Sequence, residues 1–339
     1  MSQTLNIMVL VDPGTIPNDD PEFRHITQGT TTEYYVINAL RSLRHNVSIL
    51  GAVDDIITIV KTVTELKPDL IFNLTEQLAG DRRMDMNIAA VLETTGTRYT
   101  GSGPAGLMLC RDKRLCKQLL SLYRIKVPRF VSIPQNRKIH IPKNLHYPLV
   151  VKPVFEDSSE GISNASLVNN EASLLERVRF VHERWEQAVI AEEYIEGREF
   201  YVGVIGNKQL TVLPIRECLF ASNSIEGPQL ATYRVKWNPE YRKKWNIKFR
   251  FAKLDATLVK KIQRVCKKVY RVLQIRDYGR IDLRLTANNK LVVLEVNPNP
   301  DIAYGEEVAE AAEKAGISYK KLIDRILHLA LRRYQLASS

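Results

Sequence analysis

The sequence predicts an α/β fold, with an α+β part toward the C-terminus, and three observations carry this prediction. Strand-like and helix-like segments alternate through the first 105 residues. The middle of the chain holds a short apolar strand that runs into a polar loop ending in glycine. Near the C-terminus, two arms with a clean period of two form a predicted hairpin. The chain has 339 residues, of which 45% are hydrophobic, so it is long enough for more than one domain.

Residues 1–105 are predicted to form an N-terminal α/β domain with a mostly parallel sheet. Regular alternation of strands and helices favours parallel strands that are joined by helices. A turn-rich stretch with the sequence YTGSGP, at 99–104, closes this unit. The expected strands are 5–11, 47–50 and 70–73, and the expected helices are 32–43, 54–66 and 84–94.

Residues 106–190 are predicted to form a small central unit, and residues 191–339 a C-terminal unit. The central unit is expected to contain helices at 105–122 and 171–185, a buried strand at 147–151 and a polar loop at 156–164. We expect three strands next, then an irregular segment, a long helix, the hairpin and two final helices. The ranges, as far as the hairpin, are 188–193, 199–205, 210–215, 218–250, 256–273 and 279–299.

Composition limits the classes of protein that this chain can belong to. No run of about 18 apolar residues occurs, so we expect no transmembrane helix. The N-terminus lacks the basic region and cleavage site of a signal peptide. The four cysteines have no CxxC spacing and are interpreted as free thiols. We therefore expect a cytoplasmic protein that does not contact a membrane.

The net charge of +11 favours anionic partners, and nucleotide phosphates can account for part of it. The densest basic stretch, residues 241–253, alternates with aromatic residues. We interpret it as a solvated, amphipathic surface, since no helix-turn-helix, zinc-finger or RNP pattern accompanies it. Nucleic acid is therefore not the expected partner.

The predicted hairpin separates apolar from polar side chains. Its turn is assigned to residues 287–290, where two asparagines tolerate positive φ. If the asparagines are the central residues of the turn, Asp282 lies opposite Glu295, and Arg280 lies opposite Asn297. The expected apolar face consists of Ile281, Leu283, Leu285, Val292, Leu294 and Val296, and the expected polar face of Arg280, Asp282, Arg284, Glu295 and Asn297.

Two carboxylates that face each other across a pair of strands repel and need a reason to be there. A divalent cation is one reason, because Mg²⁺ binds one or two carboxylates together with substrate phosphates. Asn297 adds a neutral oxygen, and the prolines at 298 and 300 stiffen the exit from the strand. The alternative is that Arg280 and Arg284 simply neutralise an acidic pair, and the hairpin alone leaves both explanations open.

Upstream residues suggest contacts with phosphate and with a nucleoside. Lys152 ends the apolar strand, and the loop after it offers hydroxyl and backbone N–H donors, as anion-binding loops do. No Walker motif occurs in the chain. Lys113 lies on a helix, while Glu192 and Glu199 flank a short segment between two strands. Taken singly, each of these residues favours the ordinary explanation of a surface charge or a turn.

Taken in order, these segments resemble the ATP-grasp superfamily, in particular its D-alanine–D-alanine ligase-like branch. The resemblance covers nearly the whole chain from about residue 70. It rests on several well-spaced blocks in the order found in the family. The blocks are YTGSGP with DK at 112–113, VVKP at 150–153, DSSEGI at 157–162, EEYIEGREF at 192–200, GRIDLRL at 279–285 and LEVNPNP at 294–300.

The resemblance implies an ATP-grasp fold with a central lid unit, and roles for individual residues. Lys113 and Lys152 would contact the phosphates of ATP, and Ser158 and Ser159 would lie in the loop that closes over them. Arg280 would steady the transferred phosphoryl group, and Lys236 would reach the γ-phosphate. Glu192, the backbone near Glu193 and Ile195, and Glu199 would bind the adenosine, and Asp282, Glu295 and Asn297 would bind Mg²⁺ or Mn²⁺.

The implied reaction joins a small carboxylate substrate to a small amine substrate. The carboxylate attacks ATP to form an acyl phosphate, and the amine then displaces phosphate to form an amide. Homodimers are common in the family, so a homodimer stays open for this chain.

The region that would handle amino acids departs from the family pattern. The histidine of the family's FNxxHG segment is replaced by Glu76, Asp301 stands where the ligases have glycine, and Glu306 lies near a serine position. With Glu307, these acids would suit an amine-bearing substrate. The expected activity is an amide-forming ligase with different substrates. The alternatives are a D-alanine–D-alanine ligase with a divergent amino-acid site and a regulator that binds ATP without turnover.

Overall fold

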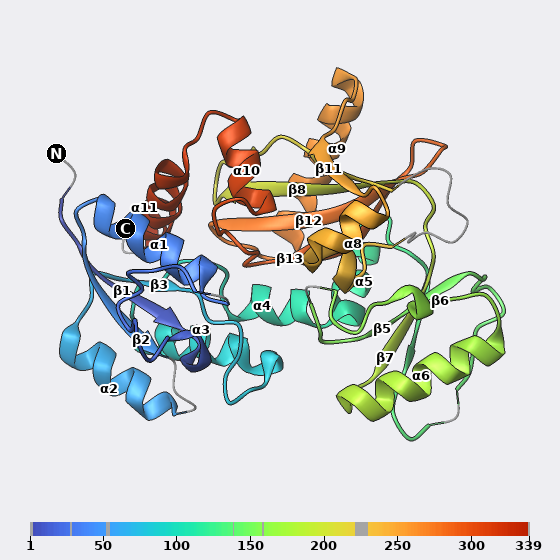
Figure 1. Cartoon of the computed structure of the whole chain (residues 1–339), viewed down its shortest axis with the longest axis horizontal. Helices are drawn as coiled ribbons and strands as arrows, with labels where there is room; N and C mark the ends of the chain where they lie inside the picture. Colours follow the sequence, from blue (N-terminus) through green and yellow to red (C-terminus); the bar gives the residue numbers. More distant parts are fainter. Residues whose placement is uncertain are drawn as a thin grey trace.

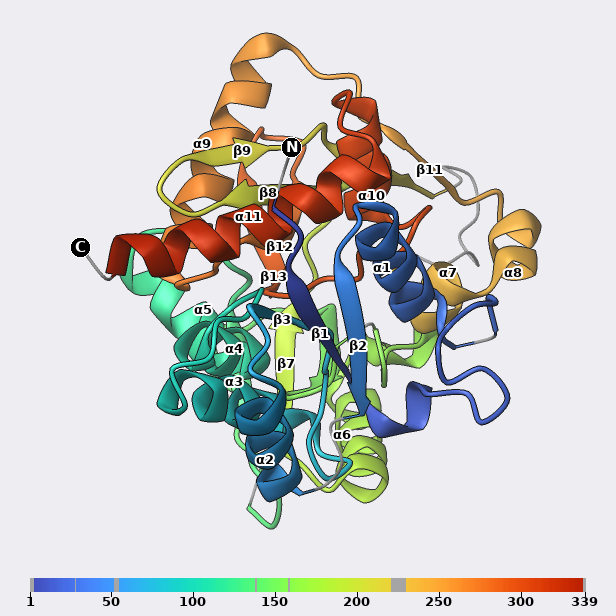
Figure 2. The same ribbon diagram turned by 90° about the vertical axis from the view of Figure 1, so that its left-hand side faces the viewer.

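The computed structural model describes residues 3–27, 29–51, 55–137, 139–157, 159–220 and 230–337. Within these ranges the chain forms three sheets, which follow one another along the sequence and are flanked by helices. Figure 1 shows the three sheets, and Figure 2 gives the same ribbon turned by 90°. The predicted mixture of helices with a parallel and a largely antiparallel part is confirmed.

The first sheet is parallel, as predicted, with the order β2-β1-β3. Its strands are β1 (Asn6–Val11), β2 (Asn46–Gly51) and β3 (Leu70–Asn73), and the helices are α1 (Thr31–Ser42), α2 (Ile56–Leu66) and α3 (Asp85–Thr94). A short 3-10 helix, Arg82–Met84, precedes α3.

The single helix predicted at 105–122 is wrong, because the chain breaks there into α4 (Pro104–Arg111) and α5 (Lys113–Leu122). Asp112 has an extended backbone, and its carboxylate accepts the N–H groups of Arg114 and Leu115 at 2.9 and 3.2 Å. An aspartate in this position is a strong start signal for a helix. The break makes Lys113 the first residue of α5.

The second sheet is antiparallel, with the order β4-β7-β5-β6. Its strands are β4 (Phe130–Ile133), β5 (Leu149–Pro153), β6 (Leu167–Val168) and β7 (Val189–Glu193), and α6 (Glu171–Trp185) packs on it. The predicted boundary at 190 falls inside β7. The division into three domains stays a prediction, and a boundary between β7 and β8 would keep each sheet whole.

The third sheet has the order β11-β10-β8-β12-β13, with β9 paired to β8. Its strands are β8 (Arg198–Gly206), β9 (Leu210–Val212), β10 (Arg216–Leu219), β11 (Lys248–Phe251), β12 (Tyr278–Leu285) and β13 (Leu291–Asn297). The helices in this part are α7 (Tyr233–Trp237), α8 (Pro239–Lys244), α9 (Ala256–Val272), α10 (Glu307–Lys314) and α11 (Tyr319–Ala337).

The long irregular segment predicted at 218–250 is therefore wrong for its described part. It contains the end of β10, both α7 and α8, and most of β11. These elements have only four to six residues each, too few to show a clear hydrophobic period. Two side chains that start the helices, Thr232 and Asn238, act as N-caps. The aromatic residues of the basic stretch pack inward, since Phe249 and Trp245 contact a small buried cluster around Tyr201.

The hairpin has the predicted register only at one end. Asp282 pairs with Glu295 and Arg280 with Asn297, as expected, but a bulge after Asp282 shifts the rest by one residue. Val293 consequently lies in the core, and Leu294 lies on the polar side. Placing Val292 and Leu294 on the apolar face was wrong, because an extra residue in one strand reverses the alternation beyond it.

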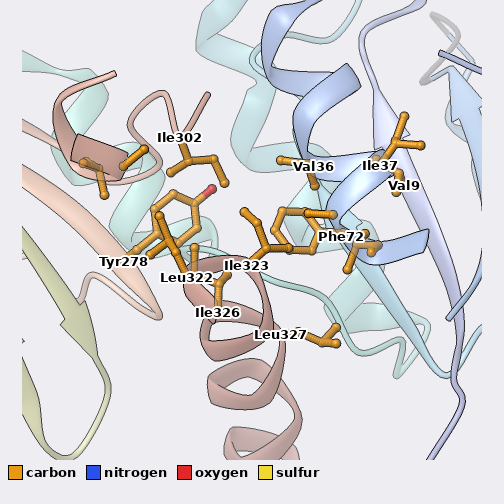
Figure 3. Close-up of a cluster of buried hydrophobic side chains, with 14 of the residues drawn as sticks. Val9, Val36, Ile37, Phe72, Tyr278, Ile302, Leu322, Ile323, Ile326 and Leu327 are labelled. Atoms are coloured by element: carbon orange, nitrogen blue, oxygen red, sulfur yellow. The ribbon is translucent and has the colours of Figure 1, made fainter. Parts of the chain in front are cut away.

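The C-terminal helix α11 completes the core of the N-terminal sheet. Figure 3 shows Ile323 and Leu327 of α11 near Phe72 and Ile37 of the N-terminal unit. Tyr278 of β12 belongs to the same buried cluster. The first and last parts of the chain therefore share one hydrophobic core.

Each of the four cysteines is free, as predicted, and each is buried. Among the described helices, none has the length and apolar character needed to cross a membrane. The cytoplasmic location and a homodimer stay predictions.

Candidate active site

A buried glutamate with two lysine partners lies between the second and third sheets. Glu192 at the end of β7 is 2% exposed, and its carboxylate oxygens lie 3.3 Å from Nζ of Lys117 and 3.2 Å from Nζ of Lys152. Burial alone would raise the pKa of Glu192, but the two ammonium groups outweigh it and lower that pKa. Glu192 is therefore an ionised acceptor at the inner end of a cleft.

Sequence reasoning missed Lys117, which also donates to the carbonyl of Leu294 on the hairpin. A usable signal existed, because α5 buries Lys113, Cys116, Lys117 and Leu120 on one side. A lysine on the buried stripe of an amphipathic helix needs a buried partner.

A second buried glutamate, Glu199 at the start of β8, is held by Arg284 and Tyr201. Nε and Nη2 of Arg284 donate to one carboxylate oxygen at 2.9 and 2.7 Å, and the Tyr201 hydroxyl donates to the other at 2.8 Å. Burial raises the pKa of Glu199, but Arg284 and Tyr201 reverse the shift and lower it. Arg284 therefore pairs with Glu199, and it does not neutralise the hairpin carboxylates.

The hairpin brings Asp282, Glu295 and Asn297 together at its open end. Nε and Nη2 of Arg280 donate to Asp282 at 2.8 and 3.1 Å, and the Asn297 amide donates to Asp282 at 3.5 Å. Nζ of Lys113 lies 3.1 Å from Glu295. The explanation that an arginine neutralises the acids is thus correct for Asp282 alone.

These residues nevertheless fit a magnesium ion by their chemistry. The group offers carboxylate and amide oxygens only, which are the ligands that Mg²⁺ prefers. Burial would raise the pKa of Glu295, but Lys113, Lys236 and Lys152 outweigh it and hold that pKa well below its usual range. Among the described residues, no three histidine, cysteine or acidic side chains gather as a metal site. A metal here would need phosphate or water oxygens to complete its shell.

One hollow lies between the second and third sheets and has apolar walls with charged ends. Glu192 and Glu199 both line it, together with Lys152, Asp282 and Glu295. The apolar walls come from Pro128, Val150, Ile162, Ile195, Leu230 and Leu294. The bulge in β13 is what turns Leu294 into this hollow. A flat, partly apolar ligand with polar edges and an anionic tail matches this arrangement.

The remaining residues predicted to bind the ligand make other contacts in this structure. The Ser159 hydroxyl donates to the carbonyl of Ala231 at 2.7 Å, and the backbone N–H of Glu193 donates to the carbonyl of Arg129 at 2.8 Å. The carbonyl of Ile195 accepts a hydrogen bond from Arg284. Ser158 lies outside the described residues. All predicted site residues that are described, apart from Lys113, Arg280 and Asn297, line the first hollow.

A second hollow adjoins the first and is rich in acidic side chains. Lys236 lines both hollows, and Arg280 and Asn297 line the second. Its acidic residues are Glu76, Asp157, Glu160, Asp301, Glu306 and Glu307, and its cationic residues are Arg82, Lys236 and Arg280. The formal charge of this lining is therefore negative, in contrast to the whole chain.

Three acidic groups in and beside the second hollow hold their protons unusually strongly. Burial of the carboxyl group and the nearby Asp157 raise the pKa of Glu76 to about 7, although 58% of the Glu76 side chain is exposed. Burial and Asp301 raise the pKa of Glu306 to about 7. Burial and Asp301 raise the pKa of Glu33 to about 7 as well. A cationic ligand would relieve this mutual repulsion.

Comparison with known proteins identifies the family of this chain. Residues 121–328 match the family model described as the D-ala D-ala ligase C-terminus. The chain belongs to the D-alanine–D-alanine ligase family. Membership confirms the predicted ATP-grasp fold and the predicted class of enzyme, an ATP-dependent carboxylate–amine ligase that forms carbon–nitrogen bonds. The alternative of a regulator without turnover is therefore not retained.

Related sequences and structures agree with this assignment. The protein y4sG of Sinorhizobium fredii is 35% identical over 78% of this chain and 75% of its own length. The D-alanine–D-alanine ligase of Aquifex aeolicus is 29% identical over 86% of this chain and 92% of its own. The Bacillus anthracis D-alanine–D-alanine ligase structure, complexed with ATP, has a TM-score of 0.74 at 20% identity and covers 98% of this chain and 99% of its own. The VanG D-Ala:D-Ser ligase structure from Enterococcus faecalis has a TM-score of 0.71 at 20% identity, over 97% of this chain and 100% of its own.

Proposed function

We propose that this ligase joins small amino-acid substrates at the expense of ATP, and that the amine-bearing substrate carries additional positive charge. The observation that carries the proposal is the meeting of the two hollows. They share Lys236, and the open end of the hairpin contributes to both, with Asp282 and Glu295 in the first and Arg280 and Asn297 in the second. A phosphoryl group bound in the first hollow would thus face a substrate bound in the second.

The first hollow would bind ATP. Its apolar walls would hold the adenine ring, with Leu294 on the side of the hairpin. Glu192 is an ionised acceptor for the amino group of adenine, and Glu199 is one for the ribose hydroxyls. The bound ATP in the Bacillus anthracis relative supports this use of the cleft.

Lys113, Lys152 and Lys236 would attract the phosphates. In this structure Lys152 lines the first hollow and pairs with Glu192, and Lys113 pairs with Glu295, which also lines this hollow. Ser159, whose hydroxyl now contacts Ala231, stays a candidate for the phosphate loop. The same assignment is proposed for Ser158.

Asp282, Glu295 and Asn297 would hold Mg²⁺ or Mn²⁺. A bound divalent ion supplies positive charge that neutralises phosphate oxygens during phosphoryl transfer. Arg280 bridges Asp282 to Glu307 of α10, with Nη1 of Arg280 3.1 Å from Glu307. It would orient the carboxylate substrate and stabilise charge on the reacting group.

The second hollow would bind the amine substrate. Glu76, Asp301 and Glu306 stand where the D-alanine ligases have other residues, and they give this hollow a negative character. Each carboxylate there would gain from a cationic partner, since charge-assisted hydrogen bonds are roughly twice as strong as neutral ones. Basic amino acids and diamines have the required chemistry.

The test is to incubate the protein with ATP, Mg²⁺ and a panel of amines and amino acids of both hands. The panel compares basic, neutral and acidic members, with D-alanine and D-serine included. Release of phosphate and the masses of the products are measured together. Amides formed preferentially with basic members would support the proposal. Equal or better turnover with D-alanine would instead favour a D-alanine–D-alanine ligase with a divergent site.

A paired variant sharpens this test. In Asp301→Gly/Glu306→Ser, two acids are replaced by the residue types that the D-alanine ligases carry there. We expect this variant to lose its preference for basic substrates while it keeps its affinity for ATP. An unchanged preference would show that these two acids do not select the substrate.

A further inference from the structure

One aspartate in the loop after β5 connects that loop to the N-terminal unit. Asp157 pairs through one carboxylate oxygen with Nη1 of Arg82 and through the other with Nη1 of Arg111. Arg111 continues to the carboxylate of Asp85 at 2.6 Å. Arg82 comes from the short 3-10 helix, Asp85 from the start of α3 and Arg111 from the end of α4. Figure 1 shows α4 lying between the N-terminal unit and the second sheet.

The ion pairs that link Asp157, Arg82, Arg111 and Asp85 form a bridge, and this bridge is partly shielded from water. The side chains of Arg111 and Asp85 are 12% and 5% exposed, so their attraction is weakly screened by water. Burial would raise the pKa of Asp157, but Arg111 and Arg82 outweigh it and keep that pKa low. Asp157 is therefore a carboxylate held between two cations.

The same loop also contacts Lys113 at the start of α5 and the segment that contains Ala231 and α7. Glu156 accepts a hydrogen bond from Lys113 through its carbonyl, and Ser159 donates to Ala231 at 2.7 Å. The N–H of Tyr233 on α7 donates to the carbonyl of Ile162 at 3.3 Å. The described residues of the loop, 156–157 and 159–162, thus lie between α5 and α7.

Arg82 also touches the hollow proposed for the amine. Its Nη1 lies 3.4 Å from Glu76, so one guanidinium faces both Glu76 and Asp157. A cation bound at Glu76 would compete with Arg82 for that carboxylate and repel the guanidinium. The ion pair between Arg82 and Asp157 would then become stronger.

We propose that Asp157, Arg82 and Arg111 are positioning residues that hold this loop over the reaction centre, and that Arg82 couples the loop to the filling of the amine hollow. The inference rests on the proposed function. A ligase of this class must keep water away from the acyl phosphate until the amine attacks. Water would otherwise break the acyl phosphate into the original carboxylate and inorganic phosphate, so ATP would be consumed without amide.

The experiment compares Asp157→Asn, Arg82→Gln and the double variant with the unchanged protein. We expect Asp157→Asn to raise the KM for ATP roughly tenfold, which is the lower range for a lost charged hydrogen bond. The ratio of phosphate released to amide formed should rise severalfold in each single variant. Because the two residues act on each other, the double variant should be little worse than either single one. The conservative variant Asp157→Glu should recover part of the lost coupling.

Glu93→Gln is the matched control. Glu93 forms a half-exposed ion pair with Arg276 at 2.7 Å, and it also joins the N-terminal unit to the C-terminal part of the chain. It should lower the melting temperature without changing the ratio of phosphate to amide. If the control raised this ratio as much as Asp157→Asn, or if the effects of Asp157→Asn and Arg82→Gln added fully, the proposal would be overturned.

A second readout separates this inference from the proposed function. Proteolysis of the loop is followed with and without a non-hydrolysable ATP analogue, which needs no turnover. The analogue should protect the unchanged protein and protect Asp157→Asn much less. If the unchanged protein makes no amide from any substrate pair, the proposed function fails while this comparison still decides the bridge. Equal protection of both proteins would overturn the bridge.

Discussion

Lys117 provides a sharp test of how the first hollow is built around Glu192. It shares the buried carboxylate of Glu192 with Lys152, and the two ammonium nitrogens lie 3.3 and 3.2 Å from the carboxylate oxygens. In Lys117→Met the side chain keeps a similar length and loses its charge. Removing one partner of a buried ion pair costs about 3–5 kcal/mol. We expect the lower end, about 3 kcal/mol, because Lys152 remains.

The variant should unfold at a lower temperature at neutral pH, and its stability should fall less toward acid than that of the unchanged protein. For a chain of 339 residues, with an unfolding entropy of about 2 cal/mol/K per residue, about 3 kcal/mol corresponds to a fall in melting temperature of about 4 °C. Glu192 has a lowered pKa in the folded protein, so its contribution to stability is present above its ordinary pKa of 4.5 and is lost as the pH falls through the folded value. Without Lys117 the folded pKa rises toward the ordinary value, so less of the stability at neutral pH depends on the ionised carboxylate and less is lost on acidification.

Thermal unfolding at neutral and mildly acidic pH measures the change in stability. Calorimetric titration with ATP measures a second expected effect, which is weaker binding of the nucleotide. A Glu192 carboxylate that is displaced toward Lys152 should bind the nucleotide more weakly. Lys61→Met is the control, since Lys61 is an exposed lysine of α2. If Lys117→Met lowered stability by less than about 1 kcal/mol, the buried pair would contribute no more than a surface ion pair does, and the reasoning would be refuted.

Four further predictions concern other parts of the molecule. Asp282→Asn should reduce phosphate release by the folded protein about a hundred- to a thousandfold and also lower the melting temperature, since the buried pair with Arg280 is weakened, and turnover close to normal would remove the metal-site assignment. Asp112→Ala should destabilise the protein by about 1 kcal/mol through loss of the cap on α5, as judged by denaturant unfolding. The KM for a basic substrate should fall as the pH rises through about 7, because Glu76 and Glu306 then lose their protons and attract the cation, whereas a flat profile would argue against their contact with it. Leu327→Ala should cost about 2–5 kcal/mol and shift the whole unfolding transition, since α11 is part of the N-terminal core, and an early separate transition of the N-terminal unit would contradict that view.

Much of the site could be predicted from local patterns. The alternation in the two hairpin arms placed Asp282 opposite Glu295 and Arg280 opposite Asn297, and the structure has these pairs. The parallel first sheet also followed from the order of its elements. Such features depend on neighbours in sequence, so a period of two or 3.6 residues is enough to reveal them.

The wrong predictions have local causes that a pattern does not display. Asp112 interrupts an otherwise helical run by capping the next helix. The bulge after Asp282 adds one residue to a strand, and this turns Leu294 from the core into the first hollow. Both are choices between backbone conformations that differ by little free energy, and packing around them decides the outcome.

The sequence by itself determined the family and the residues that face one another at the open end of the hairpin. Only the tertiary structure decided which charges neutralise one another. Arg284 pairs with Glu199, Lys117 with Glu192, and Asp157 with both Arg82 and Arg111. Arg111 and Asp157 are 46 residues apart in the sequence, and Glu199 and Arg284 are 85 residues apart. Burial makes such pairs decisive, because a charge removed from water must find a partner wherever the fold brings one close.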